Sequence, residues 1–260
     1  MDLTRLSLNQ ITMERLSLVE AILACQRHSI PHIGVWRHKL EGATLPRDTG
    51  VSVSSLCRGG MFPAATAAER QARIDDNLRA IDQAVGIGAP TLVLVCGPAP
   101  DRDIDAARSM VANGIAAIGD HARACGVRLG IEPLHPMFAG DRSVITSLAE
   151  ANSLAIQLNV GIVIDTFHVW WDPDLYPQIA RAAGRIVGFH VSDWLVPLPD
   201  VLLGRGMMGD GLIELRRIRE AVESAGYHGP VEVEIFNRTI WDSDPDTVLT
   251  TMRERFEALV

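Results

Sequence analysis

An aspartate stands at the end of a short apolar run in the segment 161–174, which reads GIVIDTFHVWWDPD. Asp165 follows four apolar or small residues, and His168 comes three positions later. A carboxylate at the end of a buried strand is costly unless a cation or hydrogen-bond donors meet it. The pattern therefore favours a binding or catalytic site. The alternative is that Asp165 caps the N-terminus of a following helix.

Three more residues of metal-ligand type stand at or near the ends of other apolar runs: Glu132, His190 and Glu234. Together with Asp165 they make three carboxylates and one imidazole. This oxygen-rich set suits Mn²⁺, Mg²⁺ or Co²⁺ better than a structural zinc ion. Each residue alone could be an ordinary buried polar group, but four in consecutive runs indicate one divalent-metal site.

Short apolar runs alternate with segments of helical periodicity along the whole chain. The expected strands cover residues 5–9, 30–36, 51–57, 91–96, 127–132, 161–165, 186–191 and 231–235. The expected helices cover residues 13–27, 67–85, 104–125, 144–158, 175–181, 212–225 and 245–259. The connection 38–50 shows no clear helix.

Strands joined by helices pair in parallel through right-handed crossovers. Eight such units in 260 residues predict an α/β fold, a closed (β/α)8 TIM barrel with a single domain over residues 1–260. A doubly wound open sheet is the competing architecture, but GxGxxG is absent from the chain. In a barrel the strands' C-terminal ends meet at the active site, which would bring the four ligand-type residues together.

Several boundaries carry local signals of their own. Gly126, Gly161 and Gly226 each stand between an expected helix and the next strand, as helix C-caps do. Asp141 and Ser143 are expected to cap the helix that starts near residue 144.

Composition excludes several classes of function. The net charge of −8 opposes non-specific binding to nucleic acid. No apolar run approaches the ~20 residues that span a membrane, and the N-terminal residues do not resemble a signal peptide. We therefore expect a cytoplasmic protein without nucleic-acid or membrane partners. Lys39 is the only lysine, so a Schiff-base mechanism would have one candidate.

The four cysteines are dispersed along the chain and form no CxxC pair: Cys25, Cys57, Cys96 and Cys125. They are expected to be buried free thiols rather than a disulfide framework or a zinc site.

The motifs IEPLHP, IDTFHVWWD, GFHVSDW and VEVEIF resemble those of the xylose isomerase-like TIM-barrel superfamily of sugar isomerases and epimerases. The resemblance runs from about residue 92 to the C-terminus, and within the superfamily the chain resembles ketose 3-epimerases and hydroxypyruvate isomerases. The related endonucleases use three zinc ions and extra histidines. This chain has Arg58 or Cys57, Cys96 and Arg205 where those histidines would fall.

The resemblance implies that Glu132, Asp165, His190 and Glu234 bind one divalent metal ion. Mn²⁺ is expected first, with Mg²⁺, Co²⁺ or Zn²⁺ as alternatives. It also implies that Glu132 and Glu234 exchange protons with the substrate carbon. His168, together with the arginine of GRGMMGDG, Arg205, is implied to contact substrate oxygens.

Four further residues are candidate substrate contacts on weaker grounds. Trp170 could form a wall against a sugar face, and His135 follows Glu132 by three positions. Packing alone would explain Trp170 equally well, and a loop hydrogen bond would explain His135. Arg37 and Arg58 follow the second and third expected strands and could contact the far end of a substrate.

Two other features belong near the same site. Glu232 alternates with Glu234 and should face inward deeper in the barrel, as a carboxylate that supports the ligands. The segment 193–210 is long and apolar for a surface loop and could be a lid or a subunit contact in a homo-oligomer.

The sequence therefore predicts a divalent-metal-dependent isomerase or epimerase acting through an enediolate on a small sugar, keto-sugar or hydroxy-ketone. A metal would hold the enediolate charge, and paired carboxylates would move the proton. One alternative is a metal-dependent lyase or dehydratase on a keto-sugar or inosose-type substrate, because its reaction begins in the same way. The other is a barrel that binds metal and sugar without catalysis.

Overall fold

The computed structural model describes residues 1–40 and 49–260. Its barrel strands are β1 (Leu6–Asn9), β2 (His32–Trp36), β3 (Ser52–Gly60), β4 (Thr91–Val95), β5 (Arg128–Ile131), β6 (Gly161–Asp165), β7 (Ile186–Val191) and β10 (Val231–Val233). All neighbouring pairs are parallel, and β1 closes the ring between β2 and β10. The predicted closed α/β barrel is confirmed.

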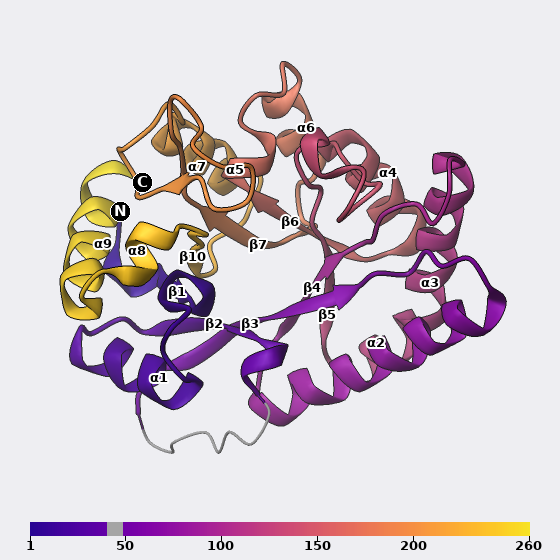
Figure 1. The fold of residues 1–260 in the computed structure, drawn as a ribbon, viewed down its shortest axis with the longest axis horizontal. Coiled ribbons are helices and arrows are strands. Elements are labelled where there is room, and N and C mark those ends of the chain that lie inside the picture. The colour runs from indigo at the N-terminus through magenta and orange to yellow at the C-terminus, as the bar shows by residue number, and fades with distance from the viewer. Residues whose placement is uncertain (41–48) are drawn as a thin grey trace.

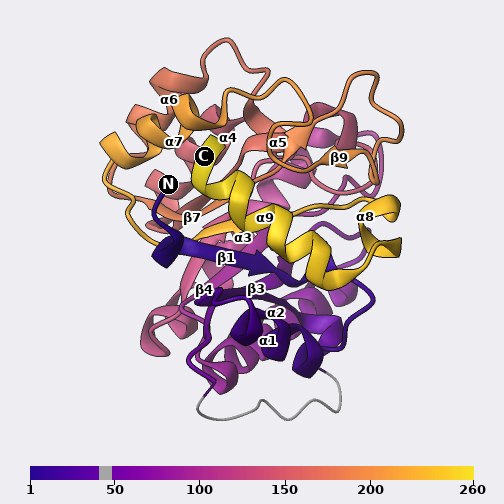
Figure 2. The ribbon, with the colours of Figure 1, turned by 90° about the vertical axis from the view of Figure 1, so that its left-hand side faces the viewer.

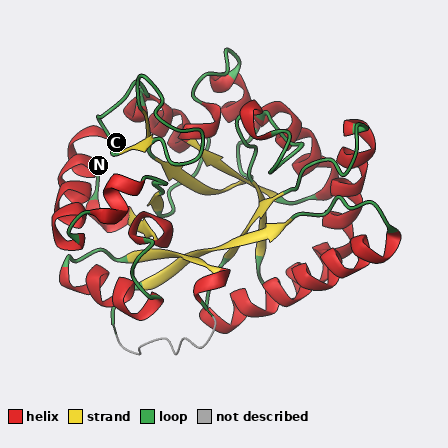
Figure 3. Cartoon of the chain, in the orientation of Figure 1, coloured by secondary structure: helices red, strands yellow, loops and turns green. Residues whose placement is uncertain are grey.

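Helices surround the ring of strands (Figures 1 and 3). They are α1 (Leu18–Arg27), α2 (Ala67–Ile87), α3 (Ile104–Ala124), α4 (Leu148–Leu158), α5 (Thr166–Val169), α6 (Leu175–Arg181), α7 (Leu215–Ser224), α8 (Arg238–Asp242) and α9 (Pro245–Leu259). The short 3-10 helices are η1 (Leu3–Arg5), η2 (Gln10–Met13), η3 (Arg37–Lys39) and η4 (Pro136–Phe138). Most of the connection 38–50, in which no helix was expected, lies outside the described residues.

A short antiparallel pair, β8 (Asp193–Trp194) and β9 (Arg205–Gly206), lies within the segment expected to be a long loop. Neither this pair nor α5 and α8 was predicted. The bounds of α6 and α9, by contrast, are those expected from the sequence.

The start of α4 differs from the prediction. Ser147 caps this helix by accepting a hydrogen bond from the backbone N–H three residues later. Asp141 and Ser143 do not cap it, because Ser143 is held in a β-bridge with Gly97. The bridge keeps this part of the chain extended, so the helix begins four residues later than expected.

The three predicted C-cap glycines divide into two kinds. Gly126 and Gly226 have φ of 72° and 93° and follow the C-cap residues of α3 and α7, Cys125 and Ala225, in agreement with the prediction. Gly161 does not cap α4, which ends on Asn159 with φ of 53°. It lies inside the barrel, where a Cβ would come within 2.4 Å of Cγ1 of Val187. Close packing, rather than a left-handed backbone, requires glycine there.

The strands are buried on both faces, as parallel strands covered by helices usually are. Every residue of β4 and β6 is buried. The thiols of Cys25, Cys57 and Cys96 are buried as expected, whereas Cys125 is partly exposed, and all four are free. Among the described helices, none combines the length and the hydropathy needed to cross a membrane.

The two ends of the chain lie side by side (Figures 1 and 2). Helix α9 runs across β1, and the N-terminal ammonium of Met1 donates a hydrogen bond of 2.6 Å to the carbonyl oxygen of Glu257.

Candidate active site

Four ligand-type side chains lie at the C-terminal ends of neighbouring barrel strands. Glu132 directly follows β5, Asp165 ends β6, His190 is the penultimate residue of β7, and Glu234 directly follows β10. One ligand atom from each lies within 4.8 Å of those of the other three. None of these residues is more than 4% exposed. The barrel thus brings together the four residues that the sequence singled out.

The cluster contains buried polar atoms that lack partners. Within the described part of the chain, Oε1 of Glu132 and both ring nitrogens of His190 form no hydrogen bond. Oε1 of Glu132 lies 3.3 Å from Nδ1 of His190, which is an ion-pair distance without hydrogen-bond alignment. Buried polar atoms are normally satisfied. Three carboxylates and an imidazole, of which Glu132 and His190 carry ligand atoms without a partner, fit one divalent cation.

Arg205 supplies positive charge to the cluster from β9. Its Nη1 donates to Oδ2 of Asp165 at 2.7 Å and to Oε2 of Glu234 at 2.9 Å. The guanidinium lies between two aromatic rings, 4.7 Å from the centroid of Phe167 and 4.9 Å from that of Phe236. Charge-assisted hydrogen bonds and cation–π contacts together fix this side chain over the strand ends.

The two glutamates are in different electrostatic surroundings. Burial raises the pKa of Glu132 to about 7, although His190 partly offsets the effect. Burial acts in the same direction on Glu234, but Arg205 and His190 outweigh it and lower its pKa to about 2. Without metal, the protein therefore holds one of these carboxyls close to its titration point at neutral pH and the other charged. Carboxyl groups whose pKa values are pushed apart are typical of acid–base sites.

Asp165 caps a helix and also lies in the ligand-type cluster. Its Oδ1 accepts a hydrogen bond of 2.9 Å from the N–H of Phe167 and caps α5. Its Oδ2 points into the cluster toward Arg205. One carboxylate therefore starts the helix and contributes to the site.

His168 follows on α5 and is almost completely buried. Its Nδ1 accepts from the backbone N–H of His135 at 3.2 Å, and its Nε2 lies 3.7 Å from Oδ2 of Asp165. Burial lowers the pKa of His168 to about 3, helped by the charge of Arg205 and opposed by Asp165. The imidazole is therefore neutral at physiological pH.

A pocket opens above the cluster. Among its lining residues are the following predicted site residues: Arg58, Glu132, His168, Arg205 and Glu234. Apolar side chains form much of the remaining wall, from Trp36, Met61, Val95, Leu134, Phe138, Leu202 and Phe236. Leu202 belongs to the segment between β8 and β9, so this segment covers part of the pocket.

The other three candidate substrate contacts lie beside this pocket rather than in its lining. His135 packs against Trp171 and Trp194. Trp170 also packs against Trp194, at 5.5 Å between ring centroids. Arg37 lines an adjoining cavity. Their contact with substrate stays a prediction.

Glu232 faces inward beneath the cluster, as expected from its alternation with Glu234. It accepts hydrogen bonds from Nδ2 of Asn9 at 3.0 Å and Oγ of Ser54 at 2.9 Å. Its Oε2 lies 3.6 Å from Nε2 of His190. Gly34 leaves the room for this carboxylate, because a Cβ there would lie 2.1 Å from Oε2.

Several residues of the site were not anticipated from the sequence. Phe236 lines the pocket and follows Glu234 by two positions, so strand alternation could have placed it on the same face. Phe167 does not line the pocket but contacts the guanidinium of Arg205, and it directly follows the DT pair of the DTFH motif. Arg142 comes from the loop after η4, and no sequence pattern marks it.

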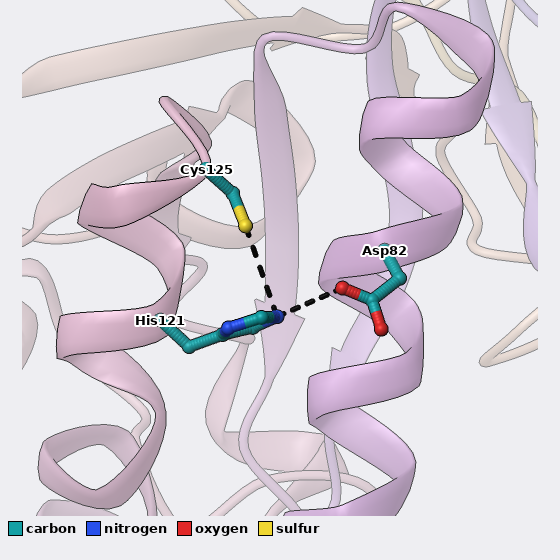
Figure 4. Close-up of side chains that lie close together, drawn as sticks. All are labelled: Asp82, His121 and Cys125. Atoms are coloured by element: carbon teal, nitrogen blue, oxygen red, sulfur yellow. Dashed lines mark hydrogen bonds and ion pairs between the residues drawn. The ribbon is translucent and has the colours of Figure 1, made fainter.

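A second group of possible metal ligands lies outside the barrel, between α2 and α3 (Figure 4). Nε2 of His121 is 2.8 Å from Oδ1 of Asp82 and 3.8 Å from Sγ of Cys125. Asp82 is exposed and the other two are partly exposed. This arrangement is an ordinary surface hydrogen bond between an imidazole and a carboxylate, with a neighbouring thiol.

The fold and the cluster define the class of protein. A family model described as "Xylose isomerase-like TIM barrel" matches residues 37–258, and the chain belongs to this family. The resemblance drawn from the sequence motifs is thereby confirmed.

Sequence identity to a named relative is low. The chain is 29% identical over 143 residues to a D-psicose 3-epimerase of Agrobacterium fabrum, a match that covers 54% of this chain and 45% of the epimerase. The chain thus spans less than half the length of that relative.

Among solved structures, a protein from Sinorhizobium meliloti 1021 is 46% identical, with a TM-score of 0.97 over 99% of both chains. The IOLI protein, whose crystal structure contains a bound zinc atom, has a TM-score of 0.85 over 98% of both chains. At 18% sequence identity, this structural similarity shows a shared fold alone.

Proposed function

We propose that this protein is a divalent-metal-dependent isomerase or epimerase that acts through an enediolate on a keto-sugar or related hydroxy-ketone. The observation that carries the proposal is the buried cluster of Glu132, Asp165, His190 and Glu234 at the strand ends. The similarity to a D-psicose 3-epimerase supports the reaction class. The zinc atom bound in the IOLI protein supports the use of a divalent metal.

The residues present suit proton transfer at a carbon next to a carbonyl. Glu132 and Glu234 enter the pocket from β5 and β10, which are separated in the ring by β6 and β7. Two carboxylates that approach from different strands can remove a proton and return one at the same or the adjacent carbon. A divalent ion held by the four ligands would supply stabilisation of the developing oxyanion charge.

The neighbouring side chains orient the substrate and limit water. Neutral His168 can form a hydrogen bond to a substrate oxygen without adding charge to the pocket. Arg205 keeps Glu234 ionised and also lines the pocket. The aromatic wall, which includes Phe138 and Phe236, reduces the water around the reacting carbon.

The proposal is tested by incubating the protein with Mn²⁺ and a panel of keto- and aldo-sugars in deuterated water. We expect NMR to show deuterium at the carbon next to the carbonyl, together with an epimer or isomer of the substrate. EDTA should abolish the reaction and added Mn²⁺ should restore it. A Glu132→Gln, Glu234→Gln double variant is the control for exchange catalysed by free metal.

Two other outcomes of this experiment would support the alternative functions. A product that has lost water identifies a lyase or dehydratase on the same site. Sugar binding without any exchange identifies a non-catalytic barrel, and either result contradicts the proposed isomerase.

A further inference from the structure

Arg58 lies where two cavities of the barrel mouth meet. The first is the pocket above Glu132 and Glu234, with a volume of about 80 Å³. The second is larger, about 310 Å³, and is lined by Arg37, His38, Arg73 and Asp76 among others. Four residues line both cavities: Trp36, Cys57, Arg58 and Met61. A ligand whose reacting end is in the first cavity can therefore extend past Arg58 into the second.

The second cavity carries excess positive charge. Arg37 is neutralised by Asp76, with two hydrogen bonds of 2.8 and 3.1 Å. In residues 1–40 and 49–260, the guanidinium groups of Arg58 and Arg73 form no ion pair and no hydrogen bond with other side chains. Two guanidinium charges therefore remain after Asp76 is counted against Arg37, in a chain whose net charge is −8.

The positive charge around the second cavity also affects the imidazole of His38, which lines this cavity. Burial lowers the pKa of His38, and the positive charges of Lys39 and Arg58 lower it further, with Glu14 opposing them. Arg142 lines the first pocket together with Arg58, and its buried Nε has no hydrogen-bond partner in the described residues. The carboxylate of Asp141 lies 3.8 Å from that nitrogen and is largely exposed.

Arg58 is partly buried and Arg73 is exposed, and a guanidinium at a cavity wall without a carboxylate partner is available to bind an anion. Its planar set of donors matches a carboxylate or a phosphate, which it binds with two parallel hydrogen bonds. A neutral sugar would leave that charge uncompensated. Binding energy from a remote anionic group can also hold the reacting carbon in place.

We infer that the substrate carries an anionic group, a phosphate or a carboxylate, and that this group binds Arg58 beside the reaction pocket. The inference rests on the proposed function, since it takes Glu132 and Glu234 as the reacting end of the site. The expected substrates are therefore sugar phosphates or sugar acids rather than neutral ketoses.

The first test measures binding and needs no turnover. Inorganic phosphate is titrated by calorimetry into the full metal-free chain, which removes phosphate binding to a metal from the measurement. We expect the dissociation constant to rise at least tenfold in Arg58→Gln. Arg79→Gln is the matched control, because Arg79 lies on α2, pairs with Asp76 and lines neither cavity. Equal phosphate binding by wild type and Arg58→Gln overturns the inference.

The second test compares matched substrates. Each neutral ketose of the panel is assayed beside its terminal phosphate and its terminal acid. We expect kcat/KM of the wild type to be about 10- to 100-fold higher for one anionic form, and Arg58→Gln to raise KM for that form by a similar factor. A preference for the phosphate or for the acid identifies which anion is used. Equal or faster turnover of the neutral sugar overturns the inference and leaves the proposed isomerase intact. Absence of exchange with every compound contradicts the proposed function instead.

Discussion

Replacing Asp165 with asparagine separates the two roles of this side chain. The carboxylate accepts from the N–H of Phe167 with one oxygen and from Arg205 with the other. An asparagine offers one oxygen and one NH2 group. Whichever way the amide is turned, its NH2 faces another donor, and one buried donor is left without an acceptor. That donor is the N–H of Phe167 in one orientation and the new NH2 in the other, since Arg205 keeps its hydrogen bond to Glu234.

The magnitude follows from the cost of that unsatisfied donor, about 1–3 kcal/mol. Weaker repulsion from Glu132 and Glu234 acts in the opposite direction, so we expect a net loss of about 1–2 kcal/mol in the metal-free protein. For a chain of this size, that loss lowers the melting temperature by roughly 2–8 °C.

The substitution should have a larger effect on the stabilisation of the protein by bound metal. Mn²⁺ at about 100 times its dissociation constant should stabilise the wild type by about 2.7 kcal/mol, or roughly 5–10 °C. If the substitution weakens binding about 100-fold, the same Mn²⁺ concentration stabilises the variant by only about 0.4 kcal/mol. The measurement is thermal unfolding of both proteins in EDTA and in Mn²⁺.

Two controls make this result specific. Asp165→Ser keeps an N-cap oxygen but has no second oxygen for the cluster, so it should also lose the Mn²⁺ effect. Asp172→Asn changes a carboxylate that accepts from the N–H of Asp174 outside the cluster, and should retain the effect. The assignment of Asp165 as a ligand is refuted if Asp165→Asn gains as much stability from Mn²⁺ as the wild type.

Three other predictions concern the remaining parts of the site. Glu132→Gln and Glu234→Gln should each lower turnover by roughly 10²–10⁴ at saturating Mn²⁺; near wild-type rates in both would disprove the two-glutamate mechanism. Gly34→Ala would place a Cβ 2.1 Å from Oε2 of Glu232, and urea unfolding should show a loss of about 1–3 kcal/mol. Unchanged stability would mean that the carboxylate moves freely. Lys39 pairs with Glu14 outside the cluster, so borohydride should trap no substrate on the protein, and a covalent adduct seen by mass spectrometry would argue for a Schiff base.

The strand positions and the four ligand-type residues were predictable because both depend on local pattern. Apolar runs of four to six residues mark buried parallel strands, and a polar residue at the end of such a run is conspicuous. Asp165 shows the limit of that reasoning. The sequence offered a site and a helix cap as alternatives, yet one oxygen caps α5 and the other faces Arg205 in the cluster.

The elements that were not predicted, such as α5 and the β8–β9 pair, depend on contacts between residues far apart in the sequence. Helix α5 is four residues long, which is too short for any periodicity to show. The β8–β9 pair joins two residues to two, and Arg205 is held there by its bonds to Asp165 and Glu234. No local sequence signal could have shown that this arginine neutralises carboxylates from two other strands.

The closing seam of the barrel has a consequence for the order of folding. Strand β10 pairs with β1, so that Leu6 is in register with Val231, and Glu234 follows directly after it. The last barrel strand to leave the ribosome therefore completes both the ring and the ligand cluster. Pairing across such a separation is slow, and the cluster forms only after that step. A cation bound at the cluster should therefore leave the folding rate unchanged and lower the unfolding rate.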